Sequence, residues 1–454
     1  MTTDTLHLPA ADLRRLQDAK LRHMIALCRR GHPYYREAWQ GLDLDAVQGI
    51  DGLWRLPLTP KRALMEHPAA FRLDCPDLPV PERALWEVVH TTGSSGDPTP
   101  IYNTTYDYHG YLLLNRRVAE IAGISDRDMI ANLFPLTAAS MGAFMRSSTL
   151  AYAAGAAVAA ALGGAPVGPF GVQKPMEEAV HLVERHHATV LWGVTSFVRR
   201  VLIRAQELGA DFRSVRMCAV TGEASTPGLR DDMRRLMKEL GCAGTIVFDR
   251  YGSTESGGLA QCREEADWHN PAPELLYHEA VDPETGRPVP EGERGHLAIT
   301  HLDRRGTVLL RYLVGDIVSI ARSPCPHCGR GGERLVGPVV RTKDLLKVKG
   351  MLINPAALLQ CLQAMQAVEE FQVVVDRSDP ADPFSMDELL VRVASRCGPE
   401  AQQVAQEVAA ATQATIGVRP RVVLEDRHAI YDAGREAKAV RFVDRRKHGE
   451  GRMP

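Results

Sequence analysis

The chain has 454 residues, 45% hydrophobic and 24% charged, with a formal net charge of −2. That length allows two or three domains with large cores, and the composition is that of an ordinary globular protein. The near-neutral charge argues against a nucleic-acid partner, which would favour a basic surface. The longest apolar stretch, residues 150–165, is short for a membrane span, so we expect no membrane partner either.

The ends and the cysteines point to a cytoplasmic protein. The first residues lack the basic segment followed by an apolar segment that marks a secretory signal. Nine cysteines, an odd number, are spread thinly along the chain. This distribution is typical of a cytosolic enzyme rather than of a disulfide scaffold. The oligomeric state is left open, with a homodimer as one arrangement.

The first eighty residues are expected to be mainly helical. Residues 12–30 carry apolar side chains at helical spacing. Six prolines between Pro57 and Pro81 then interrupt regular structure. From residue 84 onward, short apolar runs alternate with amphipathic stretches. Strands are predicted at 85–89, 129–134, 189–194, 215–220 and 245–248, and helices at 175–187, 198–208 and 226–240.

This alternation indicates an α/β domain with substantial parallel pairing. Residues 150–165, rich in alanine and glycine, are expected to form a packed helix that ends in a turn at Gly163 and Gly164. Near residues 282–286 the pattern changes to short strands, such as 296–300 and 317–320, which indicates a smaller β-rich part of the same body.

A separate module is predicted after Lys343. A helix is expected from residue 354 or 355 to 365, followed by strands at 371–375 and 389–394. A second helix at 399–416 and a strand at 420–424 complete the pattern. This order resembles the β-α-β-β-α-β order of a small split-βαβ domain.

A loop rich in hydroxyl residues follows the first predicted strand, between His90 and Thr99. Such a loop can wrap a phosphate, because glycine lets backbone N–H groups approach and hydroxyl groups add donors. It is not a Walker A loop, since the Gly-Lys-Ser/Thr ending is absent and Asp97 stands where a basic residue would be expected. Alone, the segment is better interpreted as a surface turn.

Other segments at strand ends change that interpretation. Residues 249–255 read Asp-Arg-Tyr-Gly-Ser-Thr-Glu and follow a predicted strand. Tyr251 offers an aromatic face for a base, and Glu255 offers a hard oxygen ligand for Mg²⁺. Glu223 also lies at a strand end. Asp316 follows a glycine, and its carboxylate could accept two hydrogen bonds from a ribose diol.

In this order and spacing, these residues resemble the adenylate-forming (ANL) superfamily, and specifically the phenylacetate–CoA ligase family. The resemblance extends from residues 56–61 to residues 440–445. It implies a large multi-subdomain α/β N-terminal domain over residues 1–342, which binds ATP and the acid. It also implies a small, mobile α+β C-terminal lid domain over residues 343–454. The implied small molecules are ATP, Mg²⁺, an aryl acid and coenzyme A.

The resemblance assigns a role to each matching residue. The ATP phosphates would be contacted by Thr91, Thr92, Ser94 and Ser95. The adenine would be framed by Glu223, Ala224, Asp249 and Tyr251, with Arg250, Gly252 and Thr254 in the same AMP-binding segment. Glu255 would hold Mg²⁺, Asp316 would hold the ribose, and Arg341 would contact the ribose or a phosphate. Lys343 matches the hinge position, and Lys438 matches the mobile C-terminal lysine.

The implied chemistry needs these residue types. A carboxylate oxygen attacks the α-phosphate of ATP while pyrophosphate leaves, and Mg²⁺ and the ammonium of Lys438 would offset the accumulating negative charge. A thiol then captures the acyl adenylate after the small domain rotates about its hinge. Simpler alternatives exist. Glu255 could be a carboxylate at a helix N-terminus, Asp316 a turn cap, and Lys438 part of a solvated basic stretch.

A possible metal site lies in a separate segment, where Cys325 and Cys328 are two residues apart and can share one zinc ion. Two further ligands are needed, and the family that this chain resembles includes members with a metal after the adenine-binding segment. We expect a structural zinc site formed by Cys262, His269, Cys325 and Cys328. His327 or His278 could replace His269, and the alternative is that these are ordinary thiols.

The acid substrate is expected near the middle of the large domain. Apolar and aromatic walls suit an aryl ring, although core packing would use the same residues. The residues expected to form this pocket are Phe134, Met141, Trp192, Gly193, Val194 and Phe197.

The sequence thus predicts an AMP-forming ligase that activates an aromatic or arylacetic acid and transfers it to coenzyme A. One alternative acceptor is the phosphopantetheine of a separate carrier protein, and another is an amine, both as in natural-product biosynthesis. An alternative of another class is a catalytically inactive nucleotide-binding regulator.

Overall fold

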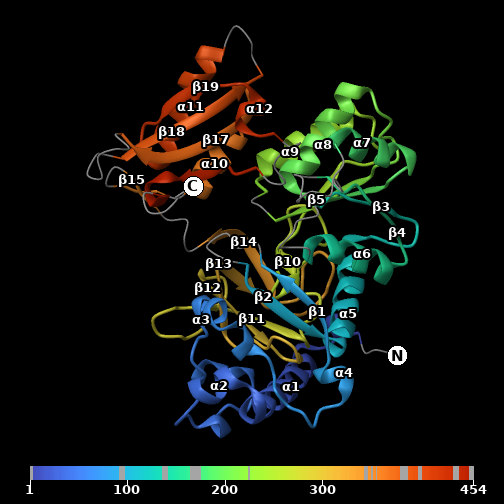
Figure 1. Ribbon diagram of the computed structural model, residues 1–454, viewed down its shortest axis with the longest axis vertical. Helices are drawn as coiled ribbons and strands as arrows, with labels where there is room; N and C mark the ends of the chain where they lie inside the picture. The colour runs from blue at the N-terminus through green and yellow to red at the C-terminus, as the bar shows by residue number, and fades with distance from the viewer. Residues whose placement is uncertain are drawn as a thin grey trace, which may run out of the picture.

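The computed structural model describes residues 4–91, 98–134, 142–163, 175–222, 225–341, 346–348, 351–353, 355–378, 387–396, 401–432 and 439–448. Figure 1 shows N-terminal helices at one end, in blue, and a C-terminal region at the other, in orange and red, beside the green helices α8 and α9. Three separate clusters of buried apolar side chains form the cores of these parts. The boundary predicted after residue 342 falls outside the described residues, together with Lys343, and stays a prediction.

The N-terminal helices pack against an antiparallel sheet, and the two share one core. In α1, the apolar residues Leu21, Met24 and Ile25 are buried at helical spacing, as the sequence predicts. The helices of this region are α1 (Ala10–Gly31), α2 (Pro33–Ala38), α3 (Lys61–Glu66) and α4 (Val80–Arg83). Short 3₁₀ turns cover Thr5–His7, Leu44–Ala46, Ile50–Arg55 and Pro68–Phe71.

His32, between α1 and α2, is fully buried as a neutral imidazole. Its Nδ1 accepts a hydrogen bond from the backbone N–H of Tyr35 (3.2 Å), so the proton lies on Nε2, which donates to the carbonyl of Val308 (3.1 Å). Burial lowers the pKa of His32 to about 4. Protonation would therefore place two N–H groups against each other inside the core.

The antiparallel sheet has the strand order β10-β14-β13-β12-β11. Its strands are β10 (Trp268–His269), β11 (Leu276–Val281), β12 (Gly295–His301), β13 (Tyr312–Ala321) and β14 (Arg334–Arg341). The two strands that the sequence predicts here, at 296–300 and 317–320, are confirmed as parts of β12 and β13.

The central sheet is parallel, with the order β4-β3-β5-β6-β7. Its strands are β3 (Met129–Asn132), β4 (Ala157–Ala160), β5 (Val190–Val194), β6 (Met217–Thr221) and β7 (Ile246–Asp249). The helices along this part are α5 (Thr105–Ala122), α6 (Gly142–Ala154), α7 (Met176–Arg185), α8 (Thr195–Leu208) and α9 (Pro227–Glu239). The predicted α/β alternation is confirmed. Because the strands are parallel, their carboxyl ends meet at one edge of the sheet.

The expected helix over residues 150–165 is wrong. Helix α6 ends at Ala154, where Gly155 adopts a left-handed conformation (φ 75°) that stops the helix. The next residues form β4, which pairs in parallel with β3 at the sheet edge. The sheet partner therefore overrides the helix propensity of alanine, and this partner is not visible in the local sequence.

Two antiparallel hairpins lie beside these sheets. Strands β1 (Leu85–His90) and β2 (Pro100–Thr104) flank the predicted phosphate loop. Strands β8 (Gly252–Ser253) and β9 (Gly257–Gly258) enclose Thr254 and Glu255.

The C-terminal region has its own core and a sheet of order β19-β18-β17-β20. Its elements are β15 (Leu346–Val348), β16 (Met351–Ile353), α10 (Pro355–Gln363), β17 (Val368–Arg377), β18 (Asp387–Ser395), α11 (Ala401–Ile416), β19 (Arg421–Leu424), α12 (Arg427–Ile430), β20 (Phe442–Asp444) and a 3₁₀ turn at Arg445–His448. The predicted helices and strands are present. The order differs from the expected one. Among the described strands, β15 pairs with β16 alone, and the fourth strand of the sheet is β20, at residues 442–444.

Polar contacts join the C-terminal region to α8 and α9, the helices beside it in Figure 1. Arg396 donates hydrogen bonds to both carboxylate oxygens of Asp232 in α9 (3.2 Å each). Arg427 donates to Glu207 in α8 (2.8 Å). These side chains are partly exposed, so each pair contributes modestly. Two apolar residues of the C-terminal region, Tyr431 and Ala439, are in addition buried in the core of the parallel sheet.

Candidate functional site

The predicted phosphate loop is closed at its base by two hydrogen bonds. The backbone N–H of Thr91 donates to the carbonyl of Thr99 (3.0 Å), and the N–H of Thr99 donates to the Thr91 hydroxyl (3.1 Å). Strands β1 and β2 therefore bring Thr91 and Thr99 together. The other residues assigned to the loop, Thr92, Ser94 and Ser95, lie outside the described residues.

Tyr251 and Asp316 come together from positions 65 residues apart. The phenol of Tyr251 donates to Oδ2 of Asp316 (2.5 Å), so the carboxylate is held beside the aromatic ring. Asp316 lies within β13, paired with Arg341 in β14, so it is not the turn cap that the sequence left as an alternative. Nothing is described of the Arg341 side chain, and Glu223 and Ala224 also lie outside the described residues.

Glu255 is buried in the turn between β8 and β9, with 4% of its surface exposed. The phenol of Tyr312 donates to its Oε1 (3.2 Å), and Nε2 of His301 donates to its backbone carbonyl (2.9 Å). No helix begins at this position, so the alternative of a carboxylate at a helix N-terminus is wrong. The side chain and the backbone of Glu255 are each held by a neighbour from the antiparallel sheet.

The rest of the segment from residue 249 to 255 fits tightly. Asp249 ends β7, its carbonyl accepts from the Trp268 indole N–H (2.9 Å), and its Oδ2 lies 3.7 Å from Nη1 of Arg230. Burial raises the pKa of Asp249 to about 7. A β-carbon at Gly252 would lie 2.7 Å from the carbonyl oxygen of Gly257, so only glycine fits this position of the hairpin.

The residues expected to line the acid pocket meet at the carboxyl end of β5. Trp192 and Val194 lie in that strand, Phe134 follows β3, and Phe197 lies in α8; all four are buried in one core cluster. A β-carbon at Gly193 would lie 2.9 Å from the β-carbon of Leu133, so this position leaves no room for a side chain. Core packing accounts for these contacts equally well, so the acid pocket stays a prediction. Met141 lies outside the described residues.

The segment that contains Lys438 is anchored near the same place. Lys438 itself lies outside the described residues, but Tyr431 and Ala439 on either side are buried in the core of the parallel sheet. The backbone N–H of Ala439 donates to the hydroxyl of Ser196 (3.3 Å), at the start of α8 and two residues after β5 ends. Ala439, which follows the predicted lysine, is thus held beside the end of β5.

The four predicted metal ligands form a cluster of their own, separate from the residues at the carboxyl end of the parallel sheet. One ligand atom from each of Cys262, His269, Cys325 and Cys328 lies within 4.8 Å of all the others. Sγ of Cys262 is 3.9 Å from Sγ of Cys325, and Sγ of Cys328 is 3.6 Å from Nε2 of His269. The proximity expected from the sequence is confirmed.

The two alternative histidines are not part of this cluster. Nδ1 of His278 lies 3.2 Å from Oε1 of Glu333, in a buried pair. The strand order explains why His269, and not His278, belongs to the cluster. His269 lies in β10, at one edge of the antiparallel sheet, and His278 lies in β11, at the opposite edge.

Sequence reasoning missed Tyr312 and His301, the two residues that hold Glu255. Tyr312 stands four positions before Asp316 in the same strand, which was the only local signal for it. Its partner is set by the pairing of distant segments, so no motif identifies it.

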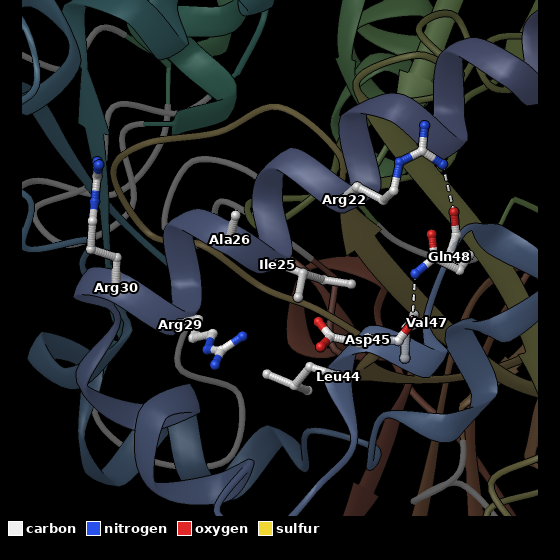
Figure 2. A pocket seen from close by; sticks show the side chains of 9 residues that line it. All are labelled: Arg22, Ile25, Ala26, Arg29, Arg30, Leu44, Asp45, Val47 and Gln48. Carbon is white, nitrogen blue, oxygen red and sulfur yellow. Dashed lines mark hydrogen bonds between the residues drawn. The ribbon is translucent and has the colours of Figure 1, made fainter.

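A hollow of about 500 Å³ lies between α1 and the segment 44–48, and Figure 2 shows the side chains that line it. It is lined by residues that include Arg22, Ile25, Arg29, Leu44 and Asp45. None of the predicted site residues lines this hollow. It is a surface feature of the N-terminal helices, separate from the sheet edge described above. Among the described helices, none has the length and apolar character needed to cross a membrane.

Comparison with known proteins gives two family matches. Residues 75–303 match the model of the AMP-binding enzyme family, and residues 350–446 match that of the AMP-binding enzyme C-terminal domain. The phenylacetate–coenzyme A ligase of Thermus thermophilus is 27% identical over 407 residues, which cover 88% of this chain and 85% of that protein. The phenylacetate–coenzyme A ligase of Aromatoleum evansii is 24% identical, covering 96% and 95%.

A solved structure confirms the fold. The crystal structure of 2-hydroxyisobutyryl-CoA ligase in the postadenylation state, in complex with 2-HIB-AMP, superposes with a TM-score of 0.80 at 24% identity. The match covers 98% of this chain and 92% of that one. The fold class expected from the sequence, a large α/β part with a small α+β part, is therefore confirmed.

Proposed function

This chain belongs to the AMP-binding enzyme family, and we propose that it activates a carboxylic acid with ATP and then transfers the acyl group to the thiol of coenzyme A. An aromatic or arylacetic acid is the leading substrate class. The names of the relatives from Thermus thermophilus and Aromatoleum evansii support this choice.

The reaction has two balanced steps. A carboxylate oxygen of the acid attacks the α-phosphorus of ATP, the bond to the β-phosphate breaks, and pyrophosphate leaves, which gives the acyl adenylate. The sulfur of coenzyme A then attacks the acyl carbon, the bond to the AMP oxygen breaks, the thiol proton is released, and AMP leaves. No protein nucleophile takes part, so the task of the protein is to position the reactants and to stabilise charge.

The observation that carries this proposal is the arrangement of the segment from Asp249 to Glu255. Tyr251 would stack on the adenine while its partner Asp316 binds the ribose hydroxyl groups. Glu255, held in place by Tyr312, would bind Mg²⁺ through a carboxylate oxygen. A magnesium ion bound there would offset negative charge on the phosphates. Lys438, the residue before Ala439, would approach the reacting oxygens.

A structural zinc ion is the second part of the proposal. Three sulfurs and one imidazole within 4.8 Å form a donor set that zinc binds tetrahedrally. Cys325 and Cys328 lie between the two matched family segments, in a turn closed by a hydrogen bond from the N–H of Gly329 to the carbonyl of Cys325 (2.9 Å). The ion would join this turn to β10 and to Cys262, and it would stabilise the sheet that carries Asp316.

The test is pyrophosphate release with ATP and a panel of aryl and arylacetic acids, followed by a competition between coenzyme A and a phosphopantetheine-loaded carrier protein. We expect acid-dependent release and formation of the acyl-CoA thioester. The Lys438→Ala variant should lose adenylation while its circular dichroism and Tm remain those of the wild type. If no acid stimulates release, the proposed activity is wrong and the regulator interpretation gains support. If the carrier protein is loaded in preference to coenzyme A, the acceptor is the carrier protein and not coenzyme A.

A further inference from the structure

Arg250 is half-buried, and it differs from buried arginines that have carboxylate partners. Its Nε is buried and has no hydrogen-bond partner in the described chain. Burial is the one cause that lowers the pKa of Arg250, to about 9, and no carboxylate contributes to that shift. By contrast, Arg311 is paired with Glu279 (3.2 Å) and Arg117 with Glu274 (2.7 Å). The guanidinium of Arg250 therefore stays charged at neutral pH without a described counter-ion.

The position of this side chain is set from two sides. Its guanidinium carbon lies 4.2 Å from the centre of the Trp192 ring, in β5. On the other side, a β-carbon at Gly258 would lie 2.6 Å from Nη2, so the absence of a side chain in β9 makes room for the guanidinium. Stacking on an aromatic face leaves the N–H edge of a guanidinium available to a planar acceptor.

Arg250 and Tyr251 are consecutive in the chain, but their side chains contact different parts of the protein. Tyr251 contacts Asp316 in the antiparallel sheet, on the side proposed for the nucleotide. Arg250 instead reaches Trp192, the aromatic residue expected in the wall of the acid pocket. The guanidinium is thus associated with the acid-binding side rather than with the ribose-binding side.

A half-buried guanidinium whose Nε has no partner in the described chain can bind a ligand of opposite charge. A carboxylate fits best, because its two oxygens match the two parallel N–H groups of a guanidinium edge. The carboxyl group that reacts must remain free to attack ATP, and an ion pair with arginine would make it a poorer nucleophile. The partner is therefore a different carboxylate.

We propose that Arg250 is a specificity residue that binds a second carboxylate of the acid substrate, remote from the carboxyl group that is adenylated. The substrate class is then a dicarboxylic acid, with an aromatic or other flat body against Trp192. This inference rests on the proposed function and narrows it from aryl acids in general to acids that carry a second negative charge.

The test compares three acids of similar shape: phenylacetate, 4-carboxyphenylacetate, and 4-nitrophenylacetate, whose nitro group is a neutral planar analogue of the second carboxylate. Initial rates of pyrophosphate release give kcat/KM for the wild type and for the Arg250→Met and Arg250→Lys variants. Methionine keeps the length and the contact with Trp192 but removes the charge, whereas lysine keeps the charge without the planar fork.

We expect the wild type to prefer 4-carboxyphenylacetate over the nitro analogue by about 10²- to 10⁴-fold, as for a buried ion pair that loses one partner. The Arg250→Met variant should lose that preference, so that its kcat/KM values for 4-carboxyphenylacetate and for the nitro analogue become similar. Arg250→Lys should recover only part of the preference. An equal loss for all three acids, or a raised KM for ATP alone, would overturn the proposal, since Arg250 would then serve the reacting carboxylate or the nucleotide.

A second readout does not depend on turnover. 4-Carboxyphenylacetate alone should raise the Tm of the wild type and not that of Arg250→Met, while phenylacetate should act equally on both. The variant without ligand should be at least as stable as the wild type, because it lacks the buried Nε that has no hydrogen-bond partner in the described chain. A Tm several degrees lower would show that Arg250 is a structural residue. If no acid releases pyrophosphate but the diacid stabilises only the wild type, the proposed function fails and the binding role of Arg250 stands.

Discussion

Replacing Tyr312 by phenylalanine removes one hydroxyl group and nothing else from the contact that orients Glu255. Both side chains are buried, with 0% and 4% of their surfaces exposed, and the hydroxyl donates to Oε1 at 3.2 Å. Without this donor the carboxylate can rotate, and it loses a partner in a site with little access to water.

The magnitude follows from the geometry. A hydrogen bond to a charged group contributes about 1.5–3 kcal/mol, equivalent to roughly 10- to 150-fold in rate. A length of 3.2 Å exceeds the usual O–H···O range. We therefore expect a decrease near the lower end, about 10- to 30-fold in kcat/KM for MgATP, and a higher Mg²⁺ concentration for half-maximal activity.

The assay is pyrophosphate release at varied ATP and Mg²⁺ concentrations, with Tyr35→Phe as the matched control. Tyr35 is equally buried, and its hydroxyl accepts from the N–H of Leu310 (2.6 Å), with no contact to Glu255. The Tyr35→Phe variant should lose about 1–3 kcal/mol of stability while keeping its kcat/KM.

Combining Tyr312→Phe with Glu255→Gln gives a double-mutant cycle. If Tyr312 acts through Glu255, the double variant should be no worse than Glu255→Gln alone. Two independent effects that multiply, or a wild-type Mg²⁺ dependence in Tyr312→Phe, would refute this role for the hydroxyl.

Elemental analysis should find one zinc ion per chain, and the Cys325→Ser/Cys328→Ser variant should lose it together with thermal stability; wild type without zinc would remove that proposal. Because His32 has a pKa of about 4 when folded and about 6.5 when unfolded, the unfolded state binds the extra proton between these values. Urea titrations should therefore show that the free energy of unfolding decreases below pH 6.5, with His32 contributing up to about 1.4 kcal/mol per pH unit. If His32→Gln leaves the slope of this free energy against pH unchanged, His32 is not the residue responsible. Asp232→Asn and Arg396→Met should show a coupling of about 0.5–1 kcal/mol in hydrogen exchange of α10, and additive effects would show that this pair does not hold the C-terminal region.

The local sequence correctly predicted the strands that are buried along most of their length. Strands β5, β6 and β7 are apolar runs bounded by amphipathic helices, so their pattern already indicates a parallel sheet. The pattern failed at residues 157–160, where alanines form an edge strand only because β3 provides the hydrogen-bonding partners. The secondary-structure propensity of a short segment contains no information about a pairing strand that lies 28 residues away in the sequence.

The candidate site was likewise predicted only in part from the sequence. Family resemblance placed Tyr251, Asp316 and Glu255 together, and the structure shows that Tyr251 contacts Asp316. The sequence favoured His269 as a metal ligand but left His327 or His278 as alternatives, because spacing does not reveal which edge of the sheet carries His269 and which carries His278. Tyr312 was missed since its partner depends on how β13 lies against the β8–β9 turn.

Tyr431 and Ala439 connect the C-terminal region to the core of the parallel sheet. Both residues belong to the matched C-terminal family segment at 350–446, and yet their side chains are buried in that core, with 3% and 8% of their surfaces exposed. Rotation of the C-terminal region away from α8 would therefore transfer apolar surface of these two residues to water, which costs free energy in proportion to the area exposed. A change in domain orientation would thus be coupled to local exposure of the large domain's core.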